Sequence, residues 1–389
     1  MKIVGIICEY NPIHRGHLRQ IRWIRQTCGA DCRIVCLMSG NFVQRGAPAC
    51  FPKMRRAEAA LRCGADLVLE LPLPYALSSA EGFAAGGVSI LGPICDGLCF
   101  GAESGEAESL LHTAELLLSQ DFSAELRKNL DQGLSFPAAR QRALGKLGAD
   151  DSILRSPNDI LGVEYCKAIL TQGHTLEPLV LRREGGYHDP LPHPDQPSAT
   201  SLRLLLEQGR PIGAYLPSGT EALFPPHELH TRAAGERAML ARLRTMTDGE
   251  FEQLPYGSEG LWRKLMHESR RQATLEEILT AVKSKRYTRS RLDRMVMCAF
   301  LGLTDEALHT PVPYVRILGF SPEGQEVLRM AKKRLTLYNV GQRIDSPFWE
   351  TEQRCTALYG LFRQNGPAPA DEEARLRVIR TAAAPQGKI

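Results

Sequence analysis

The stretch Gly5-Ile6-Ile7-Cys8-Glu9-Tyr10-Asn11-Pro12-Ile13-His14-Arg15-Gly16-His17 decides how the rest of the chain is interpreted. The apolar run over residues 3–8 is short and rich in β-branched residues, which predicts a strand. Pro12 lacks an N–H for a sheet ladder, so the strand ends before it. Leu18, Ile21 and Ile24 follow at helical spacing. The two histidines therefore lie on a turn that leaves a strand and enters a helix N-terminus.

Such a turn suits phosphate. Helix N-termini present free N–H groups and the positive end of the dipole, and Gly16 has no Cβ to obstruct a nucleotide. His14 and His17 can donate hydrogen bonds to a phosphate whose charge grows in a transition state. The alternative is that both histidines are ordinary turn and cap residues. The pair with its glycine resembles the His-x-Gly-His signature of the nucleotidyltransferase superfamily, which implies attack on the α-phosphate of ATP.

Length and composition indicate a globular protein with more than one domain. The 389 residues suffice for two or three domains with their own cores, and 43% are hydrophobic and 24% charged. No apolar run approaches the length of a bilayer span, and the first residues read as a strand rather than a signal peptide. Eleven cysteines, many inside apolar runs, are typical of reduced thiols. We therefore expect a cytoplasmic protein without membrane contact and predict no protein partner.

Three evenly spaced cysteines, Cys28, Cys32 and Cys36, raise the possibility of a metal site. Cys36 lies inside an apolar run, however, and no second Cys-x-x-Cys or histidine pair accompanies the three. We expect no metal site in the protein itself.

The charge is unevenly distributed. Residues 210–389 hold 27 Lys and Arg against 21 Asp and Glu, whereas the whole chain has a net charge of only +4. The second half therefore carries the basic surplus, which favours an anionic partner.

Short apolar runs alternate with amphipathic segments in the first half. We expect strands over residues 3–8, 30–38, 65–72, 95–100 and 176–182, with helices after 17, over 52–64 and 77–91, and through 170. This alternation predicts a parallel sheet covered on both faces. The stretch 190–197 is rich in proline and predicts an extended connection.

The expected fold class is α/β: a Rossmann-like nucleotidyltransferase domain with a parallel sheet, a helical insertion and a mainly α-helical C-terminal region. We place the catalytic domain at residues 1–210, its insertion at about 103–160, a helical, basic domain at 211–365 and a weakly ordered tail at 366–389. Polar, glycine-containing segments follow several predicted strands. The carboxyl ends of the strands are where open parallel sheets bind ligands.

A second informative stretch is Ser198-Ala199-Thr200-Ser201-Leu202-Arg203. Its hydroxyls can simply cap the helix that follows. The alternative is a triphosphate clamp, in which hydroxyls and helix N–H groups contact phosphate and Arg203 neutralises the leaving pyrophosphate. The stretch resembles the Ser-x-Thr-x-x-Arg element that nucleotidyltransferases carry late in their fold.

The densest basic run is Lys283-Ser284-Lys285-Arg286-Tyr287-Thr288-Arg289-Ser290-Arg291. Charge runs are usually solvated faces. This one can also contact RNA phosphates, with Tyr287 stacking on a base. The candidate RNA-binding residues are Lys283, Lys285, Arg286, Tyr287, Arg289 and Arg291, and the family resemblance described next implies that this RNA is a tRNA.

Taken together, these segments are similar to one family, the bacterial tRNA(Met) cytidine acetate ligases. The matching segments are residues 5–17, 38–48, 64–72, 100–103, 156–165, 182–189, 198–203 and 283–291. The segments Asn41-Phe42-Val43-Gln44-Arg45-Gly46 and Ser156-Pro157-Asn158-Asp159-Ile160-Leu161-Gly162 match the family itself, not only its superfamily.

The resemblance implies ATP-dependent acetylation of the wobble cytidine of elongator tRNA(Met), giving N4-acetylcytidine. Acetate would attack the α-phosphate, release pyrophosphate and form acetyl-adenylate, and the cytidine amine would then take the acetyl group and release AMP. Mg²⁺ is expected to accompany ATP. The chain contains no Gly-x-x-x-x-Gly-Lys-Ser/Thr loop, which argues against a P-loop mechanism.

The resemblance also implies the site. His14, His17 and Arg203 would be catalytic, and Ser39, Gly40, Asn41 and Gln44 would form the acetate pocket. The ATP-binding residues would be Ile7, Cys8, Glu9, Tyr10, Asn11, Pro12, Ile13, His14, Arg15, Gly16, His17, Leu18, Arg19, Gln20, Gly101, Asn158, Arg182, Arg183, Ser198 and Thr200. The segment Glu184-Gly185-Gly186-Tyr187 is one residue shorter than the family pattern, which leaves open whether Arg182 or Arg183 contacts phosphate.

Two other functions are compatible with parts of the sequence. An adenylyltransferase acting on a small phosphorylated metabolite would share the nucleotide motifs but would not need the long basic helical half. A tRNA- or ribosome-binding protein without activity would not need both the His-x-Gly-His and Ser-x-Thr-x-x-Arg elements.

Overall fold

The computed structural model describes residues 1–134, 136–149, 151–183 and 197–381. Its centre is an eight-stranded sheet with the order β10-β8-β5-β2-β1-β6-β7, and β9 pairs with β8 beside this path. The strands are β1 (Ile3–Cys8), β2 (Arg33–Ser39), β5 (Leu67–Leu71), β6 (Gly97–Ala102), β7 (Glu177–Arg182), β8 (Val315–Phe320), β9 (Leu337–Asn339) and β10 (Ile379–Arg380).

The predicted parallel sheet is confirmed for the five strands from the first half of the chain. β1 pairs in parallel with β2 and β6, β2 with β5, and β6 with β7. Every residue of β1 is buried, which explains its unbroken apolar sequence. The strand ends shift by a few residues from prediction: β2 begins at Arg33, not at Ala30.

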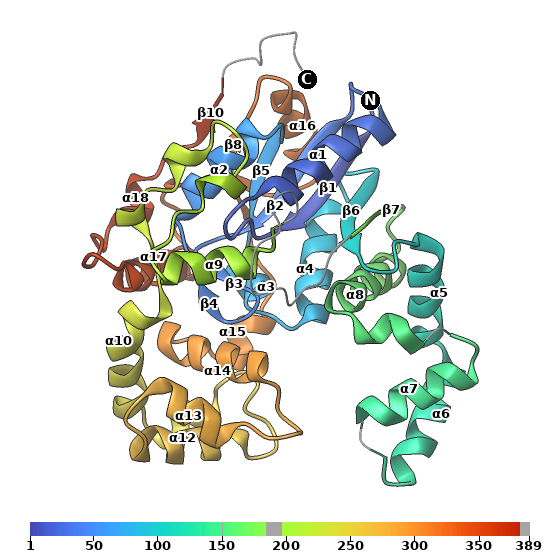
Figure 1. The fold of residues 1–389 in the computed structure, drawn as a ribbon, viewed down its shortest axis with the longest axis vertical. Coiled ribbons are helices and arrows are strands. Elements are labelled where there is room, and N and C mark those ends of the chain that lie inside the picture. Colours follow the sequence, from blue (N-terminus) through green and yellow to red (C-terminus); the bar gives the residue numbers. More distant parts are fainter. Residues whose placement is uncertain (135, 150, 184–196, 382–389) are drawn as a thin grey trace.

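Helices cover both faces of this sheet (Figure 1). α1 (Arg15–Cys28) and α2 (Lys53–Arg62) pack on the face formed by alternate β1 residues such as Val4 and Ile6. α4 (Ala80–Leu91) and α8 (Pro157–Gln172) pack on the opposite face, where Ile3 and Ile7 lie. The pleat thus sends successive side chains of one strand into two separate cores.

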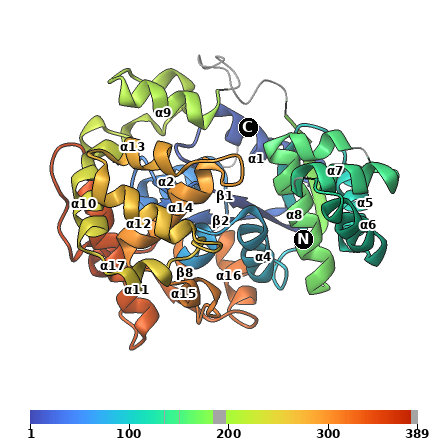
Figure 2. The ribbon, with the colours of Figure 1, turned by 90° about the horizontal axis from the view of Figure 1, so that it is seen from below.

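The predicted insertion is helical. α5 (Ala107–Leu118), α6 (Gln120–Asp131), α7 (Phe136–Lys146) and a 3-10 turn (Asp151–Arg155) extend away from the sheet (Figure 1). Seen from below, this group lies on the opposite side of the molecule from α10 (Arg232–Thr245) and α12 (Leu261–Arg271) (Figure 2).

The helical region over residues 232–309 has its own hydrophobic cluster, which includes Leu243, Leu265 and Met295. Its helices are α10 (Arg232–Thr245), α11 (Asp248–Glu252), α12 (Leu261–Arg271), α13 (Leu275–Val282), α14 (Arg289–Leu301) and α15 (Asp305–His309). The preceding helix α9 (Ala199–Glu207) belongs instead to the core on the sheet face of Val4 and Ile6, through Leu202, Leu205 and Leu206. Three short 3-10 turns, Gly213–Tyr215, Glu221–Leu223 and Pro226–Glu228, connect α9 to α10. A loop that follows β2 reaches this region: β3 (Phe42–Val43) and β4 (Ala47–Pro48) form a small hairpin, and Phe42 belongs to the helical cluster.

The C-terminal part corrects the expected domain limits. The chain returns to the central sheet through β8, which pairs antiparallel with β5, and then through β9 and β10. α16 (Gly324–Ala331), α17 (Pro347–Tyr359) and α18 (Glu372–Arg375) lie between these strands. The region 211–365 is therefore not one helical domain, and the expected weak order of the tail is wrong for residues 366–381, which include α18 and β10. β8 carries Arg316 within a short apolar run, and only its pairing with β5 reveals it as part of the sheet.

Some predictions lie outside the described residues: the extended connection over 190–196, the segment 184–189 and the end of the tail, 382–389. Among the described residues, no helix combines the length and apolarity needed to cross a membrane.

Candidate active site

The two histidines of the first motif cap helix α1 together. The Gly16 N–H donates to His14 Nδ1 (3.1 Å), and the His14 N–H donates to His17 Nδ1 (3.2 Å). The rings are stacked, with centroids 3.7 Å apart. Because each Nδ1 accepts a backbone hydrogen bond, each neutral ring carries its proton on Nε2. The cap therefore leaves two Nε2–H donors for a ligand.

The surroundings keep both rings neutral. Burial lowers the pKa of His14 well below its usual value, and the positive charges near it, on Arg183 and Arg203 as well as a protonated His17, lower it further. Burial and, secondly, Arg183 lower the pKa of His17 to about 3. At neutral pH both rings are therefore uncharged, and their N–H groups can donate hydrogen bonds to an anion.

The turn before the helix is tightly held. Tyr10 is buried with φ 46°, and its ring meets the ring of His17 edge-on at 4.9 Å. Asn11 Oδ1 accepts the Cys50 N–H (2.7 Å). The loop that carries the histidines is therefore anchored to the segment that precedes α2.

Arg203, far away in sequence, reaches the same turn. Its guanidinium donates to the carbonyl oxygen of Asn11 (2.8 Å) and to Thr200 Oγ1 (3.1 Å). Ser198 caps α9 by accepting the Ser201 N–H (3.0 Å), as the simpler interpretation of this stretch expected. The structure thus joins the two nucleotidyltransferase elements, which are separated by some 190 residues, at one place.

The structure separates Arg182, the last residue of β7, from Arg183, which follows it. Arg183 lies over Gly101, where an added Cβ would be 3.1 Å from its Cγ and Cδ, and its charge acts on His14 and His17. Arg182 lies over Gly105 instead. Arg183 therefore faces the histidine pair.

Asn158 lies at the start of α8, beside the end of β6. Its Nδ2 donates to Glu103 Oε1 (2.7 Å), and Glu103 Oε2 accepts the Asp159 N–H (3.1 Å). Asp159 in turn accepts the Ser104 N–H (3.1 Å). These hydrogen bonds fix the N-terminus of α8 against the carboxyl edge of the sheet.

The four residues expected to bind acetate lie in the loop after β2. The Gln44 N–H donates to Glu9 Oε1 (2.8 Å), so the loop closes over the end of β1. Ser39 and Asn41 are buried, however. Asn41 Oδ1 accepts the Lys53 N–H (3.1 Å), and Asn41 Nδ2 donates to Thr356 Oγ1 (3.4 Å). Of the four, only Gln44 is partly exposed. The side chains of Ser39 and Asn41 are thus not open to acetate in this structure.

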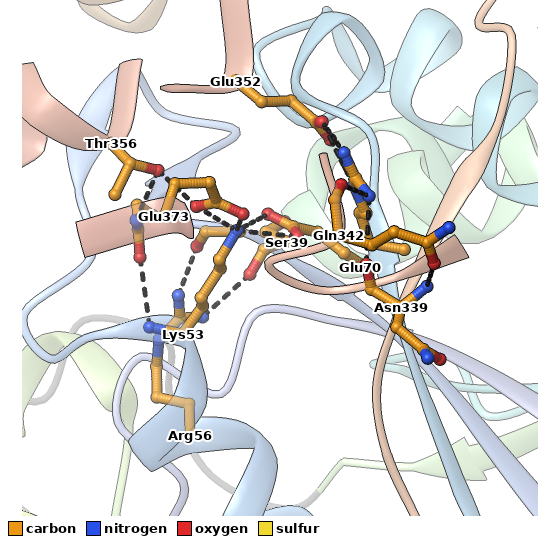
Figure 3. A network of polar contacts seen from close by, with 12 residues as sticks. Ser39, Lys53, Arg56, Glu70, Asn339, Gln342, Glu352, Thr356 and Glu373 are labelled. Atoms are coloured by element: carbon orange, nitrogen blue, oxygen red, sulfur yellow. Dashed lines mark hydrogen bonds and ion pairs between the residues drawn. The ribbon is translucent and has the colours of Figure 1, made fainter. Parts of the chain in front are cut away.

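Sequence reasoning missed a buried polar network behind this loop (Figure 3). Lys53 Nζ contacts Glu70 and Glu373, each at 2.9 Å, and Thr356 Oγ1 donates to Glu373 (2.6 Å). Burial raises the pKa of Glu70 to about 7. Lys53 and Arg56 lie in the polar first turn of a helix, which in the sequence looks exposed to solvent. No spacing in the sequence connects them to residues 352–373.

The basic run is partly occupied by contacts within the protein. Arg286 pairs with Glu259 (2.6 Å), Arg289 with Glu276 (2.5 Å), and Arg291 donates to the carbonyl oxygen of Tyr256 (2.8 Å). The Arg291 guanidinium lies 5.1 Å from the ring centroid of Tyr287. Lys283 and Lys285 are exposed and form no ion pair within the described part of the chain.

Comparisons with known proteins show the family of the chain. The HIGH Nucleotidyl Transferase family matches residues 1–373. A tRNA(Met) cytidine acetate ligase of Clostridium novyi is 37% identical over 87% of this chain and 89% of its own length. One from a Geobacillus species is 35% identical over 93% of this chain and 95% of its own.

The chain belongs to the tRNA(Met) cytidine acetate ligase family.

Two solved structures have the same fold as this chain. The structure of Thermotoga maritima TmcAL without ligand matches with a TM-score of 0.89 and 29% identity, over 98% of this chain and all of the other. The same protein bound with alpha-thio ATP matches with a TM-score of 0.87 and 28% identity. The resemblance to the ligase family in the sequence, and the predicted α/β nucleotidyltransferase fold, are thus confirmed.

Proposed function

We propose that this protein is the ATP-dependent ligase that acetylates the wobble cytidine of elongator tRNA(Met) to N4-acetylcytidine. The observation that carries the proposal is the neutral histidine pair at a helix N-terminus, with Arg203 and Arg183 beside it. This arrangement stands in a chain that matches tRNA(Met) cytidine acetate ligases over most of its length.

In the first step, a carboxylate oxygen of acetate attacks the α-phosphorus of ATP, and the bond to pyrophosphate breaks. Acetate is a weak nucleophile, so catalysis consists of in-line positioning and stabilisation of charge on the phosphate. The Nε2–H groups of His14 and His17 donate to the α-phosphate oxygens. Arg203 and Arg183 neutralise the departing pyrophosphate.

ATP occupies the carboxyl edge around β1 and β6. The contacts come from residues 7–20, Gly101, Asn158, Arg183, Ser198 and Thr200, with Arg182 as the weaker candidate. The described residues contain no group of three or more His, Cys, Asp or Glu arranged to hold a metal. Mg²⁺ would therefore enter with the nucleotide phosphates.

In the second step, the exocyclic amine of cytidine attacks the acetyl carbonyl of acetyl-adenylate. The C–N bond forms, the amine loses a proton and AMP leaves. The lone pair of this amine is delocalised into the ring, so a reactive mixed anhydride is a suitable donor. Acetate approaches from the side of the loop over residues 39–44, and tRNA contacts the surface that carries Lys283 and Lys285. We place the reaction in the cytoplasm.

The test is ATP–pyrophosphate exchange by the purified protein, with acetate and with or without tRNA. Exchange that requires acetate supports carboxylate adenylation, and sequencing of the acetylated RNA then identifies the acceptor. No exchange in either case, but turnover with a small phosphorylated metabolite, would contradict the proposal in favour of an adenylyltransferase. Binding of tRNA without either activity would indicate an inactive RNA-binding protein.

A further inference from the structure

Two arginines are almost completely withdrawn from solvent, and they are stabilised in different ways. Arg316 on β8 is 1% exposed and pairs with Glu352 (2.8 Å). Its guanidinium also lies 4.6 Å from the ring centroid of Tyr314 and 4.7 Å from that of Trp349. The positive charge of Arg316 is therefore compensated locally by a carboxylate and two aromatic rings.

Arg56 on α2 is 0% exposed, and its hydrogen bonds to described residues all go to main-chain oxygens. Figure 3 shows it beside Ser39 and Lys53. Its Nε donates to the carbonyl oxygen of Phe51 (2.9 Å). One terminal nitrogen donates to the carbonyl oxygens of Glu9 (2.6 Å) and Ser39 (3.0 Å), and the other to that of Gly40. Within the described residues this guanidinium forms no ion pair with a carboxylate.

These contacts lie where β1 and β2 separate. Their pairing ends at Cys8 and Met38. The residues that come next, Glu9 after β1 and Ser39 at the end of β2, both accept a hydrogen bond from the same nitrogen of Arg56 through their carbonyl oxygens. A strand ladder would instead occupy the Ser39 oxygen with an N–H of the neighbouring strand. Arg56 thus takes the place of the next hydrogen bond between β1 and β2, and it keeps the segments that follow the two strands apart.

The segments that follow β1 and β2 lead directly into the proposed site. Glu9 precedes the turn that ends in His14, and Ser39 and Gly40 begin the loop that returns to Glu9 through the Gln44 N–H. We propose that Arg56 is a positioning residue for adenylation: its planar guanidinium sets the spacing between the nucleotide loop over residues 9–14 and the acetate loop over residues 39–44. The inference rests on the proposed function.

The chemistry of the side chain fits this role. A guanidinium holds its N–H donors in one plane with fixed directions, whereas an ammonium has no such fork. Burial lowers the pKa of Arg56, but an arginine stays charged in a protein. A fixed positive charge without a carboxylate partner among the described residues also lies under the edge where two anions, acetate and the triphosphate, must come together.

The test compares Arg56→Lys with Arg316→Lys, a matched change at the other buried arginine. Each variant is measured for thermal unfolding, for ATP affinity and for the kcat and KM for acetate in ATP–pyrophosphate exchange. We expect Arg56→Lys to lose on the order of 100-fold in kcat/KM for acetate, since the spacing of the reacting groups changes while a charge remains. Arg316→Lys should lower the unfolding temperature at least as much as Arg56→Lys does. Its pyrophosphate exchange should nevertheless stay near the wild-type rate.

Three results would overturn the inference. The first is an exchange rate in Arg56→Lys that falls no further than in Arg316→Lys. The second is an equal loss in ATP affinity and in exchange, which would assign Arg56 to nucleotide binding alone. The third is loss of the folded state in both Arg56→Lys and Arg56→Gln, which would make Arg56 a stability residue of the domain. Absence of acetate-dependent exchange in the wild type would instead contradict the proposed function.

Discussion

His14 and His17 stack with their ring centroids 3.7 Å apart, and each accepts a main-chain N–H of the same helix start through Nδ1. One arrangement thus satisfies the helix cap and directs two Nε2–H groups away from it. The interpretation of the histidines as cap residues is confirmed, and the cap leaves their Nε2–H groups available for the catalytic role that we propose.

Replacement of His17 by Ala should abolish adenylate formation and leave tRNA affinity nearly unchanged. The variant loses one Nε2–H donor and the stacking partner of His14, so we expect a fall in pyrophosphate exchange of about 100-fold or more. His309→Ala, at an exposed histidine of α15, is the control. Equal losses in exchange and in tRNA binding would mean that His17 is structural.

Stability should fall with acidification because of the same pair. The pKa of His17 is lowered to about 3 in the folded protein, against a usual value of 6.5. Between these values the unfolded chain binds a proton that the folded one does not, so stability is full above about pH 6.5 and decreases as the pH falls toward 3. At pH 5 the loss should be about 2 kcal/mol.

The measurement is urea unfolding at pH 7.5 and pH 5, on the wild type and on His17→Gln. The variant should lose less stability than the wild type between the two pH values. Equal losses would show that His17 titrates normally in the folded protein.

Arg183→Ala should weaken ATP binding about tenfold or more, and Arg182→Ala should have a much smaller effect. Arg183 lies over Gly101 and acts on the histidine pair, whereas Arg182 lies over Gly105. A charge-assisted contact to phosphate is worth a few kcal/mol at most, which sets the scale. Calorimetry with ATP measures both variants, and the reverse order of effects would contradict the assignment.

The double change of Lys283 and Lys285 to Ala should weaken tRNA binding with ATP affinity retained. These two lysines are exposed, while Arg286, Arg289 and Arg291 already have partners. The slope of log affinity against log salt should decrease by about one for each phosphate that a lysine no longer neutralises. Lys332 and Lys333, both exposed, provide the matched double variant. An unchanged salt slope would make the run a solvated face.

Gly46→Ala should destabilise the packing between the loop after β2 and helix α14. Gly46 has φ +72°, and a Cβ there would stand 2.4 Å from the main-chain nitrogen of Arg294. Gly209→Ala is the control, because Gly209 has φ +68° but open space around it. In denaturant unfolding, the control should lose about 1 kcal/mol in free energy of unfolding, which is the usual cost of a positive φ for alanine. Gly46→Ala should lose clearly more. Equal values would mean that α14 moves aside easily.

The nucleotide-binding half of the site could be predicted from the sequence because its signals are local. A β-branched run, a proline, a glycine between two histidines and a helical apolar spacing all lie within some twenty residues. Arg203 could be associated with them only through its own local motif. Its contact with the carbonyl oxygen of Asn11 needs the folded chain.

The sequence by itself determined the parallel α/β order, the motif turn and the family, since apolar period and turn chemistry act between near neighbours. Only the tertiary structure decided that β8, β9 and β10 complete the sheet, that Lys53 meets Glu373, and that Arg56 joins Glu9 to Ser39. Those contacts depend on burial and hydrogen bonding between segments far apart in the chain. A polar residue on a helix looks the same in the sequence whether it faces solvent or the interior.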